Sequence, residues 1–227
     1  MTKVAVFASG SGTTLQAILD TFATPPGSEH VRIAVVVSNN PAAYALERAR
    51  RAGVPTVVAD HRGRSRETFE ADLAAAVDRH GADLICLAGF LRILSPAFVA
   101  RYAGRILNTH PALLPGFGGK GMYGEHVHRA VLAAGSSTSG CTIHLVDEVP
   151  DGGPIVAQSV VPVLDGDTPA SLAERVQAEE RRLYPDVIRW WAEGRVQVGG
   201  RTVILHPSSQ SDHPAGEPAA RPLTTAS

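Results

Sequence analysis

The chain has 227 residues, 44% of them hydrophobic and 19% charged, which is enough for one or two domains with a substantial core. Its 21 basic and 22 acidic residues nearly cancel, which argues against a strongly basic nucleic-acid-binding surface. The start of the chain lacks the apolar stretch of a signal peptide, and no apolar run reaches the roughly 20 residues that span a bilayer. We therefore predict a soluble, cytoplasmic protein with neither nucleic acid nor membrane as a partner.

Apolar runs alternate with helical patterns through the first half of the chain. Buried strands are predicted at 3–9, 31–38, 55–60, 83–89 and 105–108, and helices at 14–23, 42–53, 66–81 and 96–104. The strands are continuous Val/Ile/Ala runs without alternation, as expected where helices cover both faces of a parallel sheet. This half therefore indicates a doubly wound α/β fold.

The second half has a different pattern. Strand-like runs at 141–147 and 155–164 are separated by a Pro/Asp/Gly turn, which predicts an antiparallel extension of the sheet. A long amphipathic helix is expected at 168–194, kinked or split in two at Pro185. A hairpin at 195–205 follows, and the Ser/Pro/Ala/Thr-rich tail 206–227 is expected to be disordered.

The first candidate site is "ASGSGTTLQAIL", residues 8–19, where Gly10 and Gly12 follow a strand and open a helix. Such a turn directs backbone N–H groups and the helix dipole at an anion. The Lys of a Walker A loop is missing, and Leu15 occupies the third glycine position of GxGxxG. A single phosphate is therefore favoured over a dinucleotide, and a plain tight turn between strand and helix is the alternative.

The second candidate is "RILNTHPALLPGFGGKGMYG", residues 105–124. Asn108 and His110 end a strand, and ligands of open α/β sheets bind beyond the carboxyl ends of strands. Amide and imidazole N–H groups can stabilise an oxygen that becomes negative during acyl transfer. Prolines fix the exit of the strand, and glycines let the backbone approach a ligand. The alternative is a histidine that only caps a turn.

The remaining polar clusters are weaker signals. In "VDEVPDGGPIVAQ", residues 146–158, the turn carboxylates either form the turn or tune an imidazole. His126 and His128 lack a carboxylate partner at metal-ligand spacing, so no metal is predicted. His144 is interpreted as structural, and Cys86 and Cys141 as reduced, buried thiols.

Several motifs together resemble the phosphoribosylglycinamide formyltransferase family. They are "ASGSGTTLQAI", "SNNPAAYALERARRAGVP", "LAGFLRILSPAFV", "RILNTHPALLP", "HVHRAV", "DEVPDGGPIVAQ" and "RVQAEERRLYPDVIRW". The N-x-H-P-x-LLP segment alone marks a wider group of folate-dependent formyl- and hydroxymethyl-transferases. The early glycine loop and the late helix make the resemblance specific, and it covers roughly residues 3–198.

The resemblance implies the reaction and the residues that perform it. A formyl group would pass from 10-formyltetrahydrofolate, the cosubstrate, to the amine of glycinamide ribonucleotide in purine biosynthesis, without a metal. The implied catalytic residues are Asn108, a protonated His110, and Asp151. The implied ribonucleotide-binding residues are Gly12, Thr13, Thr14 and Glu180, and the implied folate-binding residues are Arg66, Leu91, Arg92, Ile93, Leu94 and Asn108.

The resemblance also implies a division of the chain. A single formyltransferase domain would cover 1–205, with a phosphate-binding half at 1–104 and a catalytic, folate-binding half at 105–205, and the protein would be a monomer or a homodimer. Two departures concern the ribonucleotide pocket. Thr14 replaces an asparagine that is usual in the family, and the loop after "LLP" is long. Lys120 in that loop either reaches the phosphate or is simply solvated.

Other functions remain as alternatives. A tRNA formyltransferase shares the N-x-H-P core but resembles a longer chain with a basic C-terminal domain. A formyltetrahydrofolate hydrolase carries an additional N-terminal regulatory domain. A non-catalytic nucleotide-binding module would be favoured by loss of one of Asn108, His110 and Asp151, and all three are present.

Overall fold

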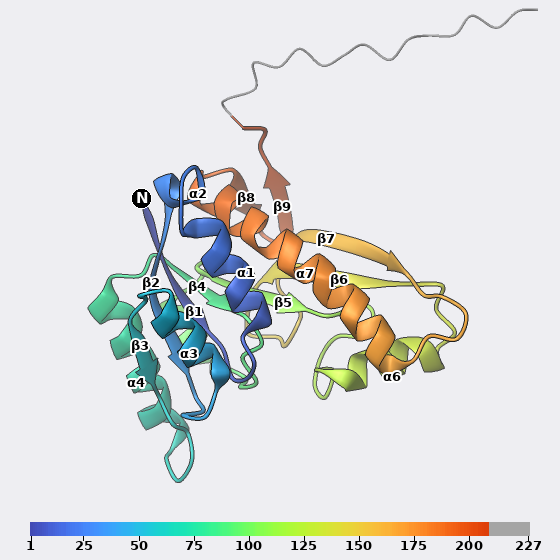
Figure 1. Ribbon diagram of the computed structural model, residues 1–227, viewed down its shortest axis with the longest axis horizontal. Coiled ribbons are helices and arrows are strands. Elements are labelled where there is room, and N and C mark those ends of the chain that lie inside the picture. Colours follow the sequence, from blue (N-terminus) through green and yellow to red (C-terminus); the bar gives the residue numbers. More distant parts are fainter. Residues whose placement is uncertain (209–227) are drawn as a thin grey trace, which may run out of the picture.

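The computed structural model describes residues 1–208 and contains a central sheet with helices on both faces (Figure 1). The strands are β1 (Thr2–Phe7), β2 (Val31–Ser38), β3 (Thr56–Val58), β4 (Leu84–Leu87), β5 (Ile106–His110), β6 (Thr138–Leu145) and β7 (Ile155–Pro162). Their order is β3-β2-β1-β4-β5-β6-β7. Pairing is parallel from β3 to β5 and antiparallel for β5–β6 and β6–β7. The predicted doubly wound sheet with an antiparallel extension is confirmed.

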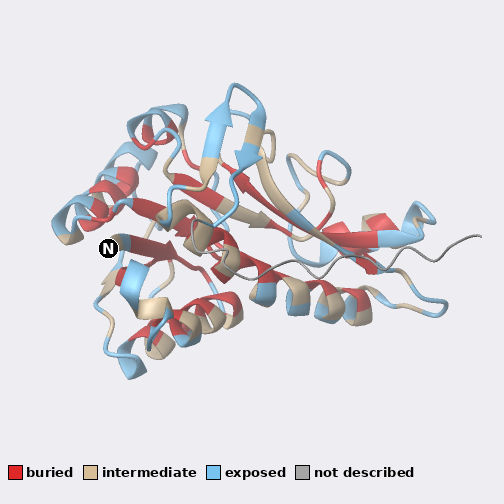
Figure 2. Cartoon of the chain, turned by 90° about the horizontal axis from the view of Figure 1, so that it is seen from above, coloured by how far each residue is buried: buried red, intermediate tan, exposed pale blue. Residues whose placement is uncertain are grey.

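Two layers of helices cover this sheet. The helices are α1 (Thr13–Phe22), α2 (Gly27–His30), α3 (Tyr44–Arg51), α4 (Arg66–His80), α5 (Pro96–Arg101), α6 (Glu125–Ala133) and α7 (Pro169–Ala192). One core cluster packs α1, α3, α6 and α7 against the sheet, and a second packs α4 and α5 against the opposite face. Figure 2 shows these buried residues along the strands and on the inner faces of the helices. The fold is therefore a three-layer α/β/α arrangement.

Helix α7 corrects one prediction from the sequence. It runs without a break from Pro169 to Ala192, so the split at Pro185 is wrong. Proline removes one backbone hydrogen bond from a helix. Tyr184, Val187 and Ile188 are nevertheless fully buried around it. Burial of such side chains stabilises by about 1.5–3 kcal/mol each, which outweighs one missing bond and keeps the helix continuous.

The C-terminal part of the described chain forms the predicted hairpin. Strands β8 (Val196–Gly199) and β9 (Thr202–Leu205) pair in an antiparallel two-stranded sheet. The predicted disordered tail begins at 206, and its residues 209–227 lie outside the described part. The short helices α2 and α6 were not predicted. No helix among residues 1–208 is both long and apolar enough to cross a membrane.

Candidate active site

Strand β5 places Asn108 and His110 on one face of the sheet. Side chains of a strand alternate between faces, and Ile106 belongs to the core on the α4/α5 side, whereas Leu107 belongs to the core on the α7 side. Asn108 and His110 therefore share the first side, and Thr109 points toward α7, where its hydroxyl donates to Glu180 at 3.2 Å. The predicted strand-end position of both residues is confirmed.

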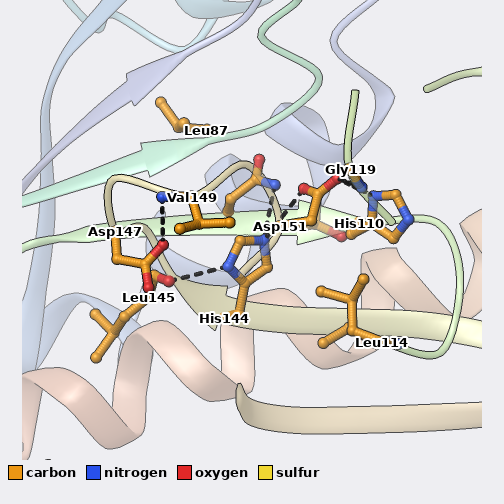
Figure 3. Close-up of polar contacts among 12 residues, drawn as sticks. Leu87, His110, Leu114, Gly119, His144, Leu145, Asp147, Val149 and Asp151 are labelled. Carbon is orange, nitrogen blue, oxygen red and sulfur yellow. Dashed lines mark hydrogen bonds and ion pairs between the residues drawn. The ribbon is translucent and has the colours of Figure 1, made fainter. Parts of the chain in front are cut away.

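The loop between β6 and β7 brings Asp151 to His110 (Figure 3). Asp151 Oδ2 lies 3.5 Å from His110 Nδ1 and accepts a hydrogen bond of 2.9 Å from the Gly119 amide. On its other side, the imidazole Nε2 of His110 donates to the Phe117 carbonyl at 2.8 Å. Two loops thus close over His110, and the structure brings Asn108, His110 and Asp151 together.

His144 is part of the same cluster, which the sequence analysis missed. It pairs with Asn108 across the β5–β6 ladder, and its Nε2 lies 3.1 Å from the Asn108 amide nitrogen. The same Nε2 is 3.7 Å from Asp151 Oδ1, and Nδ1 donates to the Leu145 carbonyl at 2.9 Å. His144 is buried, as the structural interpretation expects, and it also lies against the side chains of Asn108 and Asp151.

The pKa of His110 is set by burial as well as by its neighbour Asp151. Burial lowers the pKa of His110 more than the Asp151 carboxylate raises it, and His144 lowers it further. The pKa of Asp151 is lowered although burial alone would raise it, because the two histidines and the Gly119 amide stabilise its charge. The site therefore combines an ionised Asp151 with a His110 whose pKa is lowered overall by burial, and the implied protonated His110 at the oxyanion stage stays a prediction.

Backbone strain is concentrated at this cluster. Phe117 and Asp151 are the two non-glycine residues of the described chain with positive φ, at 54° and 56°. This conformation costs roughly 1–2 kcal/mol for a residue with a side chain. Phe117 supplies the carbonyl for His110, and Asp151 supplies the carboxylate. Strained residues tend to gather at functional sites, where the surrounding structure holds them in place.

The glycine loop opens α1 as predicted. Gly12 precedes Thr13 with φ of 72°, and no side chain caps this helix end. A Cβ at Gly12 would lie 2.8 Å from the Ala45 Cα, so α3 leaves no room for one. Arg48 of α3 fixes the loop by donating to the Ser11 carbonyl at 2.8 Å and to Gln16 at 3.0 Å. The amides at the start of α1 are thus held in a loop of fixed shape.

The residues of the implied folate-binding wall lie on two elements. Arg66 begins α4 and is exposed. Leu91, Arg92 and Ile93 are exposed in the loop after β4, and Leu94 is buried. The hydroxyl of Ser9 accepts from the Leu91 amide at 2.8 Å and donates to Asn39 at 2.6 Å. This loop and the glycine loop are therefore joined through Ser9.

Glu180 is the buried carboxylate of α7. It is 7% exposed, and Thr109 is its one hydrogen-bond partner among the described residues. Burial raises the pKa of Glu180 from 4.5 to about 7. A carboxylate that remains buried and poorly partnered at neutral pH destabilises the fold, which is a common property of a residue kept for binding.

This pKa predicts an effect on stability. A carboxyl whose pKa is raised on folding stabilises the fold below about pH 4.5, and this contribution is lost as the pH rises through about 7. Glu180→Gln cannot ionise, so it avoids this loss of stability. Its free energy of unfolding should exceed that of the parent by up to about 3 kcal/mol at pH 8 and equal it near pH 4.5. Urea unfolding at both pH values measures this. Glu179→Gln is the control, since Arg182 lowers the pKa of Glu179 and its loss should not stabilise. An equal gain in stability at pH 8 for Glu180→Gln and Glu179→Gln would contradict the raised pKa of Glu180.

The other singled-out residues lie in ordinary environments. Cys86 and Cys141 are free and buried, as predicted. His126 is exposed and His128 is buried, so helix α6 directs the two imidazoles into different surroundings. Lys120 is exposed and makes no ion pair with a described residue.

Comparison with known proteins gives the family. Residues 2–188 match the family described as formyl transferase. The chain belongs to the formyl transferase family. A phosphoribosylglycinamide formyltransferase from Escherichia coli (strain K12) is 43% identical over 197 residues, which are 86% of this chain and 90% of that protein. The crystal structure of glycinamide ribonucleotide transformylase 1 from Symbiobacterium toebii has a TM-score of 0.82 at 45% identity, covering 90% and 94% of the two chains.

Some members of this group are much longer proteins. A trifunctional purine biosynthetic protein adenosine-3 from Gallus gallus is 44% identical over 198 residues, which are 87% of this chain but 19% of that protein. The formyl transferase match includes every residue of the cluster around His110, the glycine loop and Glu180. The hairpin β8–β9 follows the end of that match.

Proposed function

We propose that the chain transfers the formyl group of 10-formyltetrahydrofolate to the amine of N1-(5-phospho-D-ribosyl)glycinamide. The products would be the N2-formyl compound and tetrahydrofolate, within de novo purine biosynthesis. The observation that carries this proposal is the cluster of Asn108, His110 and Asp151 at the carboxyl end of β5. The similarity to enzymes of this name over most of their length supports it over the alternatives.

The cluster suits direct acyl transfer. The amine attacks the formyl carbon, a tetrahedral oxyanion forms, and the bond from that carbon to N10 of the folate breaks. One amide N–H of Asn108 points at His144, and the second is left for the oxyanion. His110 Nε2 donates to the Phe117 carbonyl, and we propose that the oxyanion replaces this acceptor during the reaction.

Asp151 and His110 would handle the proton. The amine must lose one proton, and N10 of the departing tetrahydrofolate must gain one. The oxyanion favours protonation of His110, whose pKa is low without ligand, and Asp151 stabilises the resulting imidazolium. Asp151 would pass the proton onward through water. Each of these groups belongs to the protein or the substrates, so the proposed step uses no metal.

The two substrates would bind on either side of the cluster. We assign the phosphate to the amides of Gly12, Thr13 and Thr14 because the start of α1 carries uncapped N–H groups. Glu180 would accept hydrogen bonds from the ribonucleotide. The folate would contact Arg66, Arg92 and Asn108 with its polar groups and Leu91, Ile93 and Leu94 with its ring. Leu91 and Ile93 are 62% and 59% exposed, so both side chains are accessible to such a ring.

The choice of acceptor tests the reaction. Purified protein with 10-formyltetrahydrofolate is offered glycinamide ribonucleotide, charged methionyl-tRNA or water alone, and tetrahydrofolate release is measured. We expect release with the ribonucleotide only. Release with tRNA or without an acceptor would favour a tRNA formyltransferase or a hydrolase. The division at residue 104, the cytoplasmic location and the monomeric or dimeric state stay predictions.

The glycine loop gives a prediction with a matched control. Gly12→Ala places a Cβ 2.8 Å from the Ala45 backbone at positive φ, whereas Gly10→Ala meets no atom within 4 Å. We expect Gly12→Ala to weaken ribonucleotide binding at least tenfold and folate binding much less, since the displaced amides contact only the phosphate. Gly10→Ala should bind both like the parent. Calorimetric titration measures this, and an equal loss for both ligands in Gly12→Ala would contradict the phosphate assignment.

A further inference from the structure

The loop that carries Asp151 is contacted from outside by the C-terminal hairpin. This β6–β7 loop, residues 146–154, connects the two strands, and Arg201 lies at the turn between β8 and β9. The guanidinium of Arg201 donates from Nη2 to the Gly152 carbonyl at 2.5 Å. Its Nη1 lies 3.7 Å from Asp147 Oδ2. One side chain thus bridges the beginning and the end of the loop, and one of its partners directly follows Asp151.

The conformation of the β6–β7 loop depends on contacts from outside it. Asp151 is held at positive φ, an unfavourable conformation, and the loop should relax if the contacts that hold it are lost. A surface hollow lies between the loop, the end of α5 and the hairpin, lined by Val146, Pro154, Val99 and Val198 among others. Val146 packs against the α4/α5 core at the start of the loop, but the hollow leaves the rest of this side without full packing. The planar guanidinium of Arg201 adds one hydrogen bond and one ion pair there.

We propose that Arg201 is a positioning residue that holds the β6–β7 loop so that the Asp151 carboxylate stays against His110 and His144. The inference rests on the proposed role of Asp151 in the reaction. It gives the hairpin, which lies beyond the formyl transferase match, a function in catalysis (Figure 1). Arg201 itself touches neither substrate nor reacting atoms in this assignment.

The test compares two arginines of the same hairpin. Arg201→Ala removes the bridge, and Arg201→Lys retains the charge but loses the fork. Arg195→Ala is the control, because Arg195 bonds to the His206 carbonyl at 2.7 Å and to Glu193 at 3.1 Å rather than to the β6–β7 loop. Each variant is measured for kcat, for KM of both substrates, for thermal unfolding and for the titration of His110 by NMR.

We expect Arg201→Ala to lower kcat about 3- to 10-fold, which corresponds to the net contribution of one ordinary hydrogen bond, with both KM values within twofold of the parent. The pKa of His110 should fall, because the Asp151 charge that raises it is displaced. The kcat and the His110 pKa of Arg201→Lys should lie between those of the parent and those of Arg201→Ala. Arg195→Ala should retain the parent kcat and His110 titration even where its melting temperature falls.

Two outcomes would overturn the proposal. One is an Arg201→Ala variant with the parent kcat and the parent His110 titration, as expected for a solvated surface ion pair. The other is an equal loss of kcat in Arg195→Ala, which would attribute the effect to hairpin stability. Asp151→Asn in the same assay separates this inference from the proposed function. If Asp151→Asn is inactive and Arg201→Ala is normal, only the bridge fails, whereas an active Asp151→Asn removes the proposed mechanism.

Discussion

Replacing Asp151 by asparagine should lower single-turnover formyl transfer by about 10²–10³, the usual cost of losing one preorganised group at an oxyanion site. The variant retains the size of the side chain and removes its charge. Asp151 is the group that raises the pKa of His110 against the effect of burial. Without it, the pKa of His110 should be lower still, which disfavours the imidazolium that would stabilise the oxyanion. Ribonucleotide affinity should remain close to that of the parent, since the glycine loop and Glu180 are unchanged.

The pH dependence sharpens this expectation. The pKa of Asp151 is lowered, so its charge is present throughout the neutral range and is lost only on strong acidification. The rate of the parent should therefore exceed that of the variant at every pH from about 6 to 9. Glu148→Gln is the control, because it removes an exposed carboxylate from the same loop. A rate for Asp151→Asn within threefold of the parent would exclude Asp151 from the mechanism. Added EDTA should leave the rate of the parent unchanged, and inhibition would contradict the metal-free mechanism.

The sequence predicts those parts of the site that follow from local pattern. Asn108 and His110 end an apolar run, and the pattern of a parallel sheet is enough to place them at its ligand-binding edge. Gly12 precedes a helix start, so the same kind of local pattern predicts a phosphate loop there. Asp151 required the family resemblance, because its distance from His110 along the chain is bridged only by the fold.

Other residues depend on contacts that the sequence does not display. His144 lies in an apolar strand, and its role comes from pairing with Asn108 across the antiparallel ladder. The alternation of that strand is visible in the sequence, but the pairing partner and the register are not. Phe117 acts through its backbone carbonyl, which side-chain chemistry cannot reveal. Arg201 lies in the turn of the β8–β9 hairpin and contacts the β6–β7 loop of the main sheet. No sequence motif around Arg201 predicts that contact.

The pKa of His110 depends on its burial, which the sequence does not show. The carboxylate neighbour was expected, and its effect on the pKa has the expected direction. Burial outweighs it, because His110 is 3% exposed beneath two loops. The degree of burial depends on the path of residues 113–124 and 146–154 over the sheet. Helix α6 was missed for a related reason: it follows an N-cap glycine, Gly124, and has two histidines in its first turn, and tertiary packing of Val127 and Val131 stabilises it.

Replacing Asn108 by aspartate should lower turnover even more than replacing it by alanine. Asn108→Ala removes one N–H donor from the oxyanion, with an expected loss of about 10²–10³. Asn108→Asp also places a negative charge where the oxyanion forms, and beside the Asp151 carboxylate, which adds repulsion. Lowering the pH should narrow the difference between the two variants, because a protonated carboxyl becomes a donor. Single-turnover rates between pH 5 and 8 measure this, with binding of ribonucleotide and of a folate analogue as tests of folding. Equal rates for Asn108→Ala and Asn108→Asp across that range would show that charge at this position does not govern the transition state. An Asn108→Ala rate close to that of the parent would remove Asn108 from the oxyanion site.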